Sequence, residues 1–244
     1  MDSVTGQPSY NSTGQMFSRI APFYDKLNHI LSFGMDFFWR NRLALSIEHG
    51  KKLRVLDLAT GTGDLLITVL NKNSGITEAV GLDISEEMLE ICRRKIARYN
   101  LTEKSNLICA DMNSSGLSEK TFDVITIGFG IRNTPDASAA LSEIFRLLRY
   151  GGTTFILEFS MPANPVIRFF YLIYLRHCVP LIGRVLSGDK NAYKYLNTSV
   201  EKFYSAKDFT FLMRKAGFED IQTVPLTFGV ARIYRGSKPV KINS

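Results

Sequence analysis

The feature that most constrains the fold is an apolar segment that runs into a glycine-rich turn and is followed by a second apolar segment ending in an acid. The first segment and its turn read Val-Leu-Asp-Leu-Ala-Thr-Gly-Thr-Gly-Asp at residues 55–64, and the second ends at Asp83. Glycines let the backbone approach a ligand closely, and an acid at the end of the next strand accepts hydrogen bonds from ribose hydroxyls. The pattern predicts an α/β fold that binds an adenosine-bearing ligand.

The turn distinguishes two classes of adenosine cofactor. A dinucleotide-binding turn reads Gly-x-Gly-x-x-Gly, and Leu66 stands at the third glycine position here. Asp57 before the turn and Asp64 after it would repel a pyrophosphate and attract a sulfonium and an ammonium group. We therefore predict S-adenosylmethionine (SAM) and not NAD. The alternative is a plain strand–turn–helix in which the glycines serve only the turn.

Strand patterns alternate with helical patterns along most of the chain, which predicts a mostly parallel sheet with helices on both faces. We expect strands at 53–58, 78–83, 105–109, 122–129, 153–159, 219–225 and 229–235. Expected helices span 62–72, 86–99, 136–149 and 206–216. Two aromatic segments, 16–50 and 163–203, lie outside this alternation. They form either a lid over the carboxyl ends of the strands, where ligands bind in such sheets, or extra core packing.

The positive charge of the chain is concentrated near the second aromatic segment. Residues 163–215 hold nine Lys and Arg against three Asp and Glu, a net +6, whereas residues 1–162 hold 17 against 18. This distribution argues against a globally basic nucleic-acid binder and favours contact with an anionic membrane surface, with solvated helix faces as the alternative. The N-terminus lacks the pattern of a secretory signal, and the apolar stretch 169–175 is far shorter than the about 20 residues of a membrane span.

The cysteines and histidines are scattered. Cys92, Cys109 and Cys178 form no C-x-x-C pair, and the three histidines do not cluster. We therefore predict no metal site and no disulfide, and a reducing cytoplasm suits the chain.

From about Met16 to Gly236 the chain resembles the ubiquinone/menaquinone biosynthesis C-methyltransferases, which are class I SAM-dependent enzymes. Beyond the cofactor turn, the resemblance rests on Ala21-Pro-Phe-Tyr-Asp25, Leu31-Ser-Phe-Gly34, Trp39-Arg40, Ile127-Gly-Phe-Gly-Ile-Arg-Asn133, Glu158-Phe-Ser160 and Tyr193-Lys-Tyr-Leu196. It implies a Rossmann-like, mostly parallel seven-stranded sheet with helices on both faces. A single domain would span 16–236, with a helical lid at 16–50 and an aromatic, basic lid insertion at 163–203, between a flexible tail at 1–15 and a C-terminal tail at 237–244.

The resemblance also assigns residues to SAM. Those at the turn cradle the methionine part, Asp83 takes the ribose hydroxyls, and Asp111 with Met112 lies at the adenine. Taken alone, Asp111 would more often be a solvated loop acid. Gly128 stands where the family often has serine, which puts a side-chain contact there in doubt. The turn residues are Asp57, beneath the turn, and Ala59, Gly61, Thr62 and Gly63.

The implied reaction is C-methylation of a polyprenylated quinol ring, demethylmenaquinol to menaquinol. The benzoquinol step of ubiquinone synthesis is one alternative, and a non-catalytic SAM- and quinone-binding scaffold is another. Arg132 would stabilise the developing phenolate, unless it is a surface ion-pair partner, and Asn133 would orient the hydroxyl or a water. Tyr24 and Asp25 are candidates for the lid side of the site. Asp36 replaces a common histidine, which weakens the case for a histidine base.

The partners implied are a lipophilic prenylated quinol and an anionic membrane surface, with no nucleic acid and with a homodimer left open. We accordingly expect a cytoplasmic enzyme that associates peripherally with the inner face of the membrane.

Overall fold

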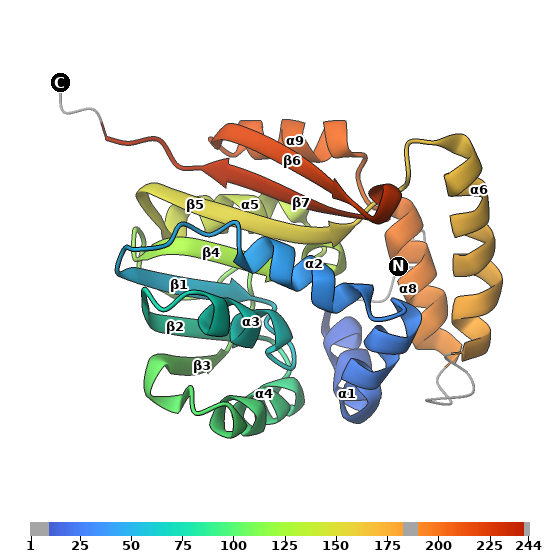
Figure 1. Cartoon of the computed structure of the whole chain (residues 1–244), viewed down its shortest axis with the longest axis horizontal. Coiled ribbons are helices and arrows are strands. Elements are labelled where there is room, and N and C mark those ends of the chain that lie inside the picture. Colours follow the sequence, from blue (N-terminus) through green and yellow to red (C-terminus); the bar gives the residue numbers. More distant parts are fainter. Residues whose placement is uncertain (1–9, 183–189, 242–244) are drawn as a thin grey trace, which may run out of the picture.

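A computed structural model describes residues 10–182 and 190–241, and it has the expected mostly parallel sheet (Figure 1). The strands lie in the order β3-β2-β1-β4-β5-β7-β6, and β7 is antiparallel to both β5 and β6. The strands are β1 Leu53–Leu58, β2 Ile76–Asp83, β3 Ser105–Cys109, β4 Phe122–Gly128, β5 Leu148–Phe159, β6 Glu219–Leu226 and β7 Ala231–Ser237. The main helices are α1 Tyr10–Leu31, α2 Met35–Ala44, α3 Asp64–Lys72, α4 Glu86–Arg98, α5 Ala137–Leu147, α6 Pro165–Ile173, α8 Lys190–Lys202 and α9 Ala206–Lys215.

Local chemistry explains several element ends. The Ser85 hydroxyl accepts a hydrogen bond from the Met88 N–H at 3.2 Å and so caps α4. Asp136 caps α5 through the Ser138 N–H at 2.7 Å. We expected this helix to continue to residue 149. It ends at Leu147 because Leu148 already pairs with Phe122 of β4, so strand pairing replaces the last helical turn.

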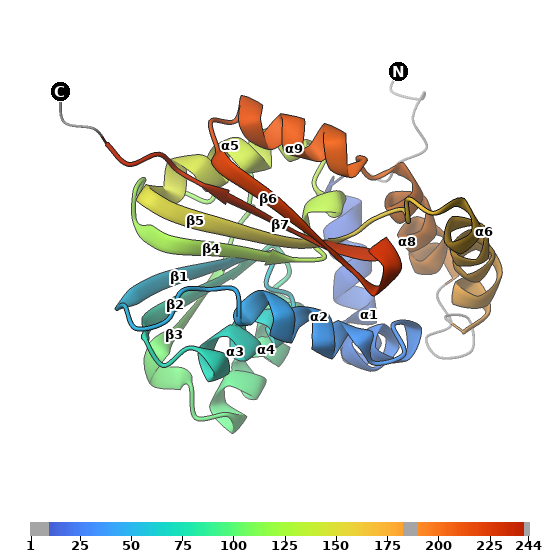
Figure 2. The same ribbon diagram turned by 45° about the horizontal axis from the view of Figure 1, so that its top comes forward.

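Helices cover both faces of the sheet (Figure 2). Along β1, Val55 belongs to the apolar core shared with α2, α3 and α4, whereas Leu56 and Leu58 belong to the core shared with α5 and α9. Alternate residues of a strand point to opposite faces, so a strand that is apolar throughout is buried on both sides. The sheet is therefore a rigid support for the loops at its carboxyl edge.

The two aromatic segments lie at that edge. Helices α1 and α8 and the turn of π-helix η3, Tyr174–Cys178, form an apolar cluster separate from the two sheet cores. Its buried members are Met16, Ile20, Leu27, Leu175, Val179 and Val200. Residues of the same elements also line a cavity beside the strand ends, so the packing role is present and the lid role stays a prediction.

Both tails are shorter than we expected. Residues 10–15 belong to α1 and not to a flexible tail, and residues 1–9 lie outside the described residues. At the other end Ser237 belongs to β7, and the buried Lys238 donates to the carbonyl oxygens of Phe145 at 2.6 Å and Leu148 at 2.9 Å. Residues 183–189 of the second segment and the last three residues also lie outside the described residues.

Candidate active site

The two glycines of the turn serve different purposes. Gly61 has φ +55° and Gly63 has φ +84°, both in the left-handed region. A Cβ on Gly63 would lie 2.3 Å from the Sγ of Cys92, so this glycine lets α4 pack against the turn. A Cβ on Gly61 would meet nothing within 4 Å, so the space above it is open to a ligand. Only Gly61 therefore fits the expectation of close ligand approach.

Asp57 lies beneath the turn, as expected. Its carboxylate is 1% exposed and accepts hydrogen bonds from Thr60 Oγ1 at 2.7 Å and Thr126 Oγ1 at 2.6 Å. Burial raises the pKa of Asp57 to about 6, although both threonine hydroxyls act to lower it. Asp57 thus ties the turn to β4.

Asp83 lies at the end of β2 and faces the turn. Its Oδ2 accepts the Gly61 N–H at 2.8 Å and its Oδ1 accepts the Ser85 N–H at 3.0 Å. Burial raises the pKa of Asp83, while these backbone donors and that of Ile84 act to lower it. A carboxylate has about four acceptor positions, so these three backbone donors leave Asp83 the capacity to accept a further hydrogen bond from the ribose of a ligand.

Two cavities meet at the turn. The smaller one, of about 70 Å³, is lined by Asp83, Met112 and Asn133 among others. The larger one, of about 240 Å³, is lined by Thr62, Arg132 and residues of α1, α2 and η3. Residues common to both linings are Tyr24, Ala59, Gly61, Gly128 and Phe129. The glycine turn therefore lies at the boundary between two adjoining binding spaces.

Asp111 is not among the residues that line either cavity, although its neighbours Ala110 and Met112 line the smaller one, and its contact with an adenine stays a prediction. Its carboxylate accepts the backbone N–H of Asn113 at 2.7 Å and the side-chain amide of Asn113 at 3.0 Å, so it stabilises its own loop. The neighbouring Met112 is 3% exposed and does line the smaller cavity. Gly128 also lines the cavities, and a Cβ there would come within 3.0 Å of Leu65 Cδ2.

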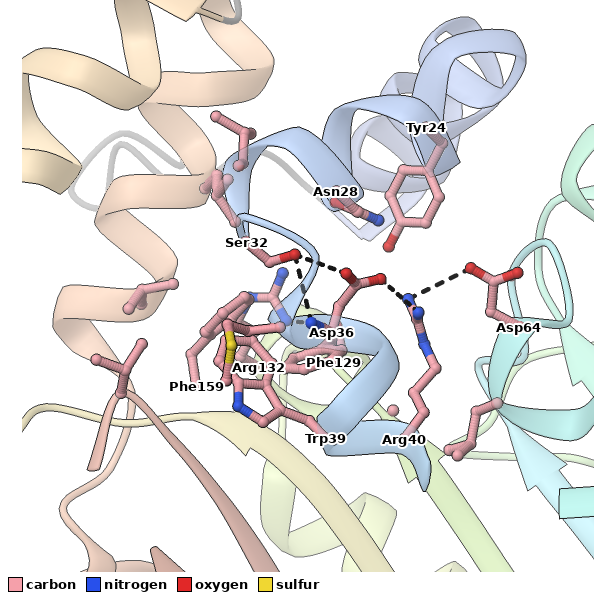
Figure 3. Close-up of a pocket in the computed structure, with 18 of the residues that line it drawn as sticks. Tyr24, Asn28, Ser32, Asp36, Trp39, Arg40, Asp64, Phe129, Arg132 and Phe159 are labelled. Atoms are coloured by element: carbon pink, nitrogen blue, oxygen red, sulfur yellow. Dashed lines mark hydrogen bonds and ion pairs between the residues drawn. The ribbon is translucent and has the colours of Figure 1, made fainter. Parts of the chain in front are cut away.

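The larger cavity has a polar end and an apolar end. Figure 3 shows the Tyr24 hydroxyl pointing toward the Asp36–Arg40 pair at the polar end. Burial raises the pKa of Tyr24, while the Arg132 charge and a hydrogen bond with Asn28 act to lower it. Tyr24 is thus a neutral hydroxyl in contact with both cavities. The apolar end is lined by Leu31, Phe33, Tyr171, Tyr174, Leu175, Val179, Leu196 and Val200.

Arg132 is buried beside the larger cavity and is not a surface ion-pair partner. Its side chain is 5% exposed, and its Nη1 lies 2.8 Å from a carboxylate oxygen of Glu158, whose side chain is 0% exposed. The guanidinium also lies over the Phe159 ring, 5.1 Å from its centre. The buried Nε of Arg132 has no hydrogen-bond partner among the described residues. A buried donor without a partner is costly, so a ligand oxygen would complete this site.

The other two catalytic candidates, Asn133 and Asp25, do not line the larger cavity. Asn133 lines the smaller cavity, and its Oδ1 accepts the hydroxyl of Tyr195 at 3.3 Å. The carboxylate of Asp25 does not line either cavity. It accepts hydrogen bonds from Thr62 Oγ1 at 2.5 Å and from Lys95 Nζ at 2.9 Å, and so holds α1 against α3 and α4. Asp25 thus contacts the turn through Thr62, and its role on the lid side of the site stays a prediction.

Sequence reasoning missed a charged network at the polar end. Arg40 Nη1 lies 2.5 Å from Asp36 and its Nη2 lies 3.4 Å from Asp64, which also pairs with Lys95. His29 Nδ1 lies 2.6 Å from Asp36. Burial acts to raise the pKa of Asp36, but Ser32, Arg40 and His29 together hold it below its ordinary value. The spacing of Asp36 and Arg40 by four residues is a typical helical ion pair and was the available signal.

This network also bears on metal binding. The ligand atoms of His29, Asp36 and Asp64 lie within 4.8 Å of one another. Arg40 contacts both carboxylates, so the protein itself supplies the compensating positive charge there.

The open space above Gly61, the remaining acceptor capacity of Asp83 and the apolar Met112 fit an adenosine-bearing cofactor. Solved structures have the same fold: the [4+2]-cyclase SpnF has a TM-score of 0.70 at 17% identity, covering 98% of this chain and 100% of that chain. A SAM-dependent methyltransferase of Thermotoga maritima has a TM-score of 0.65 at 19% identity, covering 92% and 99%. The fold is thus that of the class I SAM-dependent methyltransferases, and the site fits an adenosine-bearing cofactor of the kind that they bind.

Sequence comparison gives the family. A model of the ubiE/COQ5 methyltransferase family matches residues 7–238. The chain is 41% identical over 226 residues to the ubiquinone/menaquinone biosynthesis C-methyltransferase UbiE of Geobacter sulfurreducens, covering 93% of this chain and 88% of that protein. It is 41% identical over 225 residues to the demethylmenaquinone methyltransferase of Thermus thermophilus, covering 92% and 100%. The chain belongs to the ubiE/COQ5 methyltransferase family, and its cofactor is SAM.

Proposed function

We propose that this enzyme methylates a ring carbon of a reduced polyprenylated naphthoquinone, converting demethylmenaquinol to menaquinol. The observation that carries the proposal is the larger cavity, which joins the glycine turn at its polar end and is apolar and aromatic at the other. A quinol head with an isoprenoid tail has the same division between polar and apolar parts. The relatives from Thermus thermophilus and Bacteroides fragilis are named demethylmenaquinone methyltransferases.

For the cofactor, we assign the adenosine part of SAM to the smaller cavity. Asp83 would accept the ribose hydroxyls and Met112 would pack against the adenine. Thr62, Ala59 and Gly61 would lie beside the methionine part, at the boundary between the cavities. When bound, SAM supplies an electrophilic methyl group. Asp57 and Gly63 would act through the shape of the turn, and Asp111 through its loop.

For the substrate, we assign the quinol head to the polar part of the larger cavity. A quinol ring becomes nucleophilic at carbon when a hydroxyl loses its proton, so the protein must favour the resulting oxyanion. Tyr24 keeps its proton because burial raises its pKa, and its hydroxyl can donate to the quinol oxygen. The free Nε of Arg132 can donate to the same oxygen. Asn133 would hold the Tyr195 hydroxyl at the back of the site.

The direct test supplies SAM with a labelled methyl group and, in parallel reactions, either reduced demethylmenaquinone or a reduced polyprenylated benzoquinone that lacks the methyl group, each in detergent, and identifies the product by mass. Appearance of labelled menaquinol supports the proposal. Labelling of a demethylated benzoquinol instead would assign the chain to the ubiquinone step. No labelled product under single-turnover conditions, with SAM bound, would leave a non-catalytic binding protein as the better description.

The role of Arg132 has its own test. In Arg132→Ala, we expect turnover to fall by about a hundredfold or more with SAM affinity unchanged, since loss of one oxyanion donor typically has this effect. Arg149→Ala is the matched control, because Arg149 pairs with Asp123 at the surface and lines neither cavity. Full turnover in Arg132→Ala would refute the assignment.

We also propose that the enzyme is cytoplasmic and contacts the inner membrane face peripherally. The net +6 of residues 163–215 and the lipophilic substrate support this proposal. A homodimer remains a second assembly hypothesis, and light scattering on the purified chain distinguishes it from a monomer.

A further inference from the structure

Helix α6 and its continuation carry apolar side chains on their outer surface. Val166, Phe169, Phe170 and Ile173 are 62%, 61%, 64% and 40% exposed, and their spacing places them along one helix face. In Figure 1, α6 lies at the outer edge of the molecule. The stretch Pro165–Ile182 is long enough and apolar enough to cross a membrane by length and composition alone, and 17% of it is buried.

The inner face of the same stretch belongs to the folded domain. Leu175 and Val179 are 4% and 2% exposed and pack with residues of α1 and α8. The stretch is therefore apolar on both sides, although only one side is covered by described parts of the chain. Crossing a bilayer would remove Leu175 and Val179 from their cluster, whereas lying on a bilayer would cover the outer face and leave the cluster intact.

The larger cavity opens beside this outer face. Phe33 lines the cavity and is nevertheless 78% exposed, so it marks the mouth. Its ring centre lies 5.6 Å from that of Tyr174, which lines the cavity from the η3 side. Phe33 has φ +52° and is followed by Gly34 with φ +74°. A bulky residue rarely adopts this conformation, and here it accompanies an aromatic ring held in solvent at the mouth.

Charge favours an anionic bilayer over a second copy of the chain. The exposed Arg168 lies on α6, and residues 163–182 hold two arginines and no acidic residue, a net +2. Two copies that met through this segment would bring like charges together, whereas anionic lipid headgroups would neutralise them.

We propose that the outer face of α6, together with Phe33, docks on an anionic bilayer, and that the substrate's tail enters the cavity between Phe33 and Tyr174. The entry route rests on the function proposed above, while the docking face stands on its own exposure and charge. Docking in this orientation lets a lipophilic quinol pass from the bilayer into the apolar end of the cavity without crossing water.

The test compares the double variant Phe169→Ser/Phe170→Ser with Phe211→Ser. Phe211 is 62% exposed on α9, on a different side of the molecule from α6, so it is a control matched in residue type and exposure (Figure 2). In sedimentation with phosphatidylglycerol vesicles, the double variant should partition about tenfold or more weakly than the wild type, because it has lost two inserted rings. The control should partition as the wild type does. Vesicles of phosphatidylcholine alone should bind all three proteins weakly.

Activity separates this inference from the proposed function. With a short-tailed quinol in detergent, the double variant should turn over as the wild type does. With a long-tailed quinol in vesicles, it should lose activity in parallel with binding. A wild type that is inactive on both substrates refutes the proposed function and leaves the vesicle-binding comparison to judge the docking face.

Equal vesicle binding by the double variant and the control would overturn the docking face. So would light scattering that shows a wild-type dimer and a monomeric double variant, because the face would then join two copies. An unchanged unfolding midpoint of the double variant establishes that it is folded.

Discussion

The buried pair of Arg132 and Glu158 gives the sharpest test of how the active site is held together. The Glu158 carboxylate accepts Arg132 Nη1 at 2.8 Å, the Arg132 N–H at 3.2 Å and the Phe159 N–H at 2.8 Å. Glu158→Gln keeps the shape and one acceptor oxygen but removes the charge. The guanidinium of Arg132, at 5% exposure, is then left without its counter-charge.

The expected cost follows from burial. Removing one partner of a buried ion pair typically lowers the free energy of unfolding by about 3–5 kcal/mol, since the remaining charge stays desolvated. A half-exposed ion pair contributes only about 0–1 kcal/mol to the free energy of unfolding. The pair of Arg54 and Glu78 provides that comparison, because its Nη2–Oε1 distance is also 2.8 Å but its side chains are 36% and 46% exposed. Glu78→Gln is therefore a control with the same substitution and the same partner type.

The assay is urea unfolding at neutral pH for the single variants Glu158→Gln, Glu78→Gln and Arg132→Met and for the double variant Arg132→Met/Glu158→Gln. We expect Glu158→Gln to cost at least about 2 kcal/mol more than Glu78→Gln, and the double variant to be more stable than Glu158→Gln, because it no longer buries a lone cation. Equal costs at positions 158 and 78, or strictly additive effects in the double variant, would refute the reasoning.

Three further outcomes follow from the geometry. Gly61→Ala should weaken SAM binding by calorimetry with only about 1 kcal/mol lost in urea unfolding, from strain at φ +55°, whereas Gly63→Ala should destabilise the fold, because its Cβ would lie 2.3 Å from Cys92 Sγ. Folding raises the pKa of Asp57 from 3.8 to about 6, so ionisation of Asp57 costs the fold about 3 kcal/mol, a penalty that is absent below pH 4 and complete above about pH 6. Urea unfolding should therefore show that the free energy of unfolding of Asp57→Asn rises relative to that of the wild type by roughly that amount between pH 4 and pH 7. The same difference at both pH values would argue against a raised pKa. Lys95→Met should loosen α1, seen as faster limited proteolysis near Asp25, because it removes the cation that Asp25 and Asp64 share.

The strands and most helix starts could be predicted because their signals are local. The apolar run at 122–129 and the start of the helix at residue 86 depend only on neighbouring residues, and both appear in the structure within a residue or two. The glycine turn and Asp83, which we expected to bind one ligand, lie together, and the Gly61 N–H donates a hydrogen bond to Asp83. This contact could be anticipated because parallel strands end at the same edge of a sheet.

The polar end of the cavity could not be predicted in this way, since its contacts join helices far apart in sequence. Lys95 reads as a cation placed at the end of α4, yet its ammonium group reaches Asp25, 70 residues earlier. Glu158 stood out only as part of a family motif, although it is the counter-charge of Arg132. The replacement of a histidine by Asp36 suggested that an imidazole was missing, but His29 supplies one from the preceding helix.

These contacts change the electrostatic basis of cofactor choice. The sequence argument counted Asp57 and Asp64 as two free negative charges around the turn. In the structure Asp64 is paired with both Lys95 and Arg40, so much of its charge is compensated within the protein. Asp57 and Asp83 are the carboxylates that line the cavities without a basic side chain in contact, and burial raises the pKa of each. A cationic ligand in the site would favour their ionised forms. The preference for a sulfonium over a pyrophosphate therefore rests on this pair beneath and beside Gly61, and Asp64 serves mainly to fasten α2, and through Lys95 α1, to the turn.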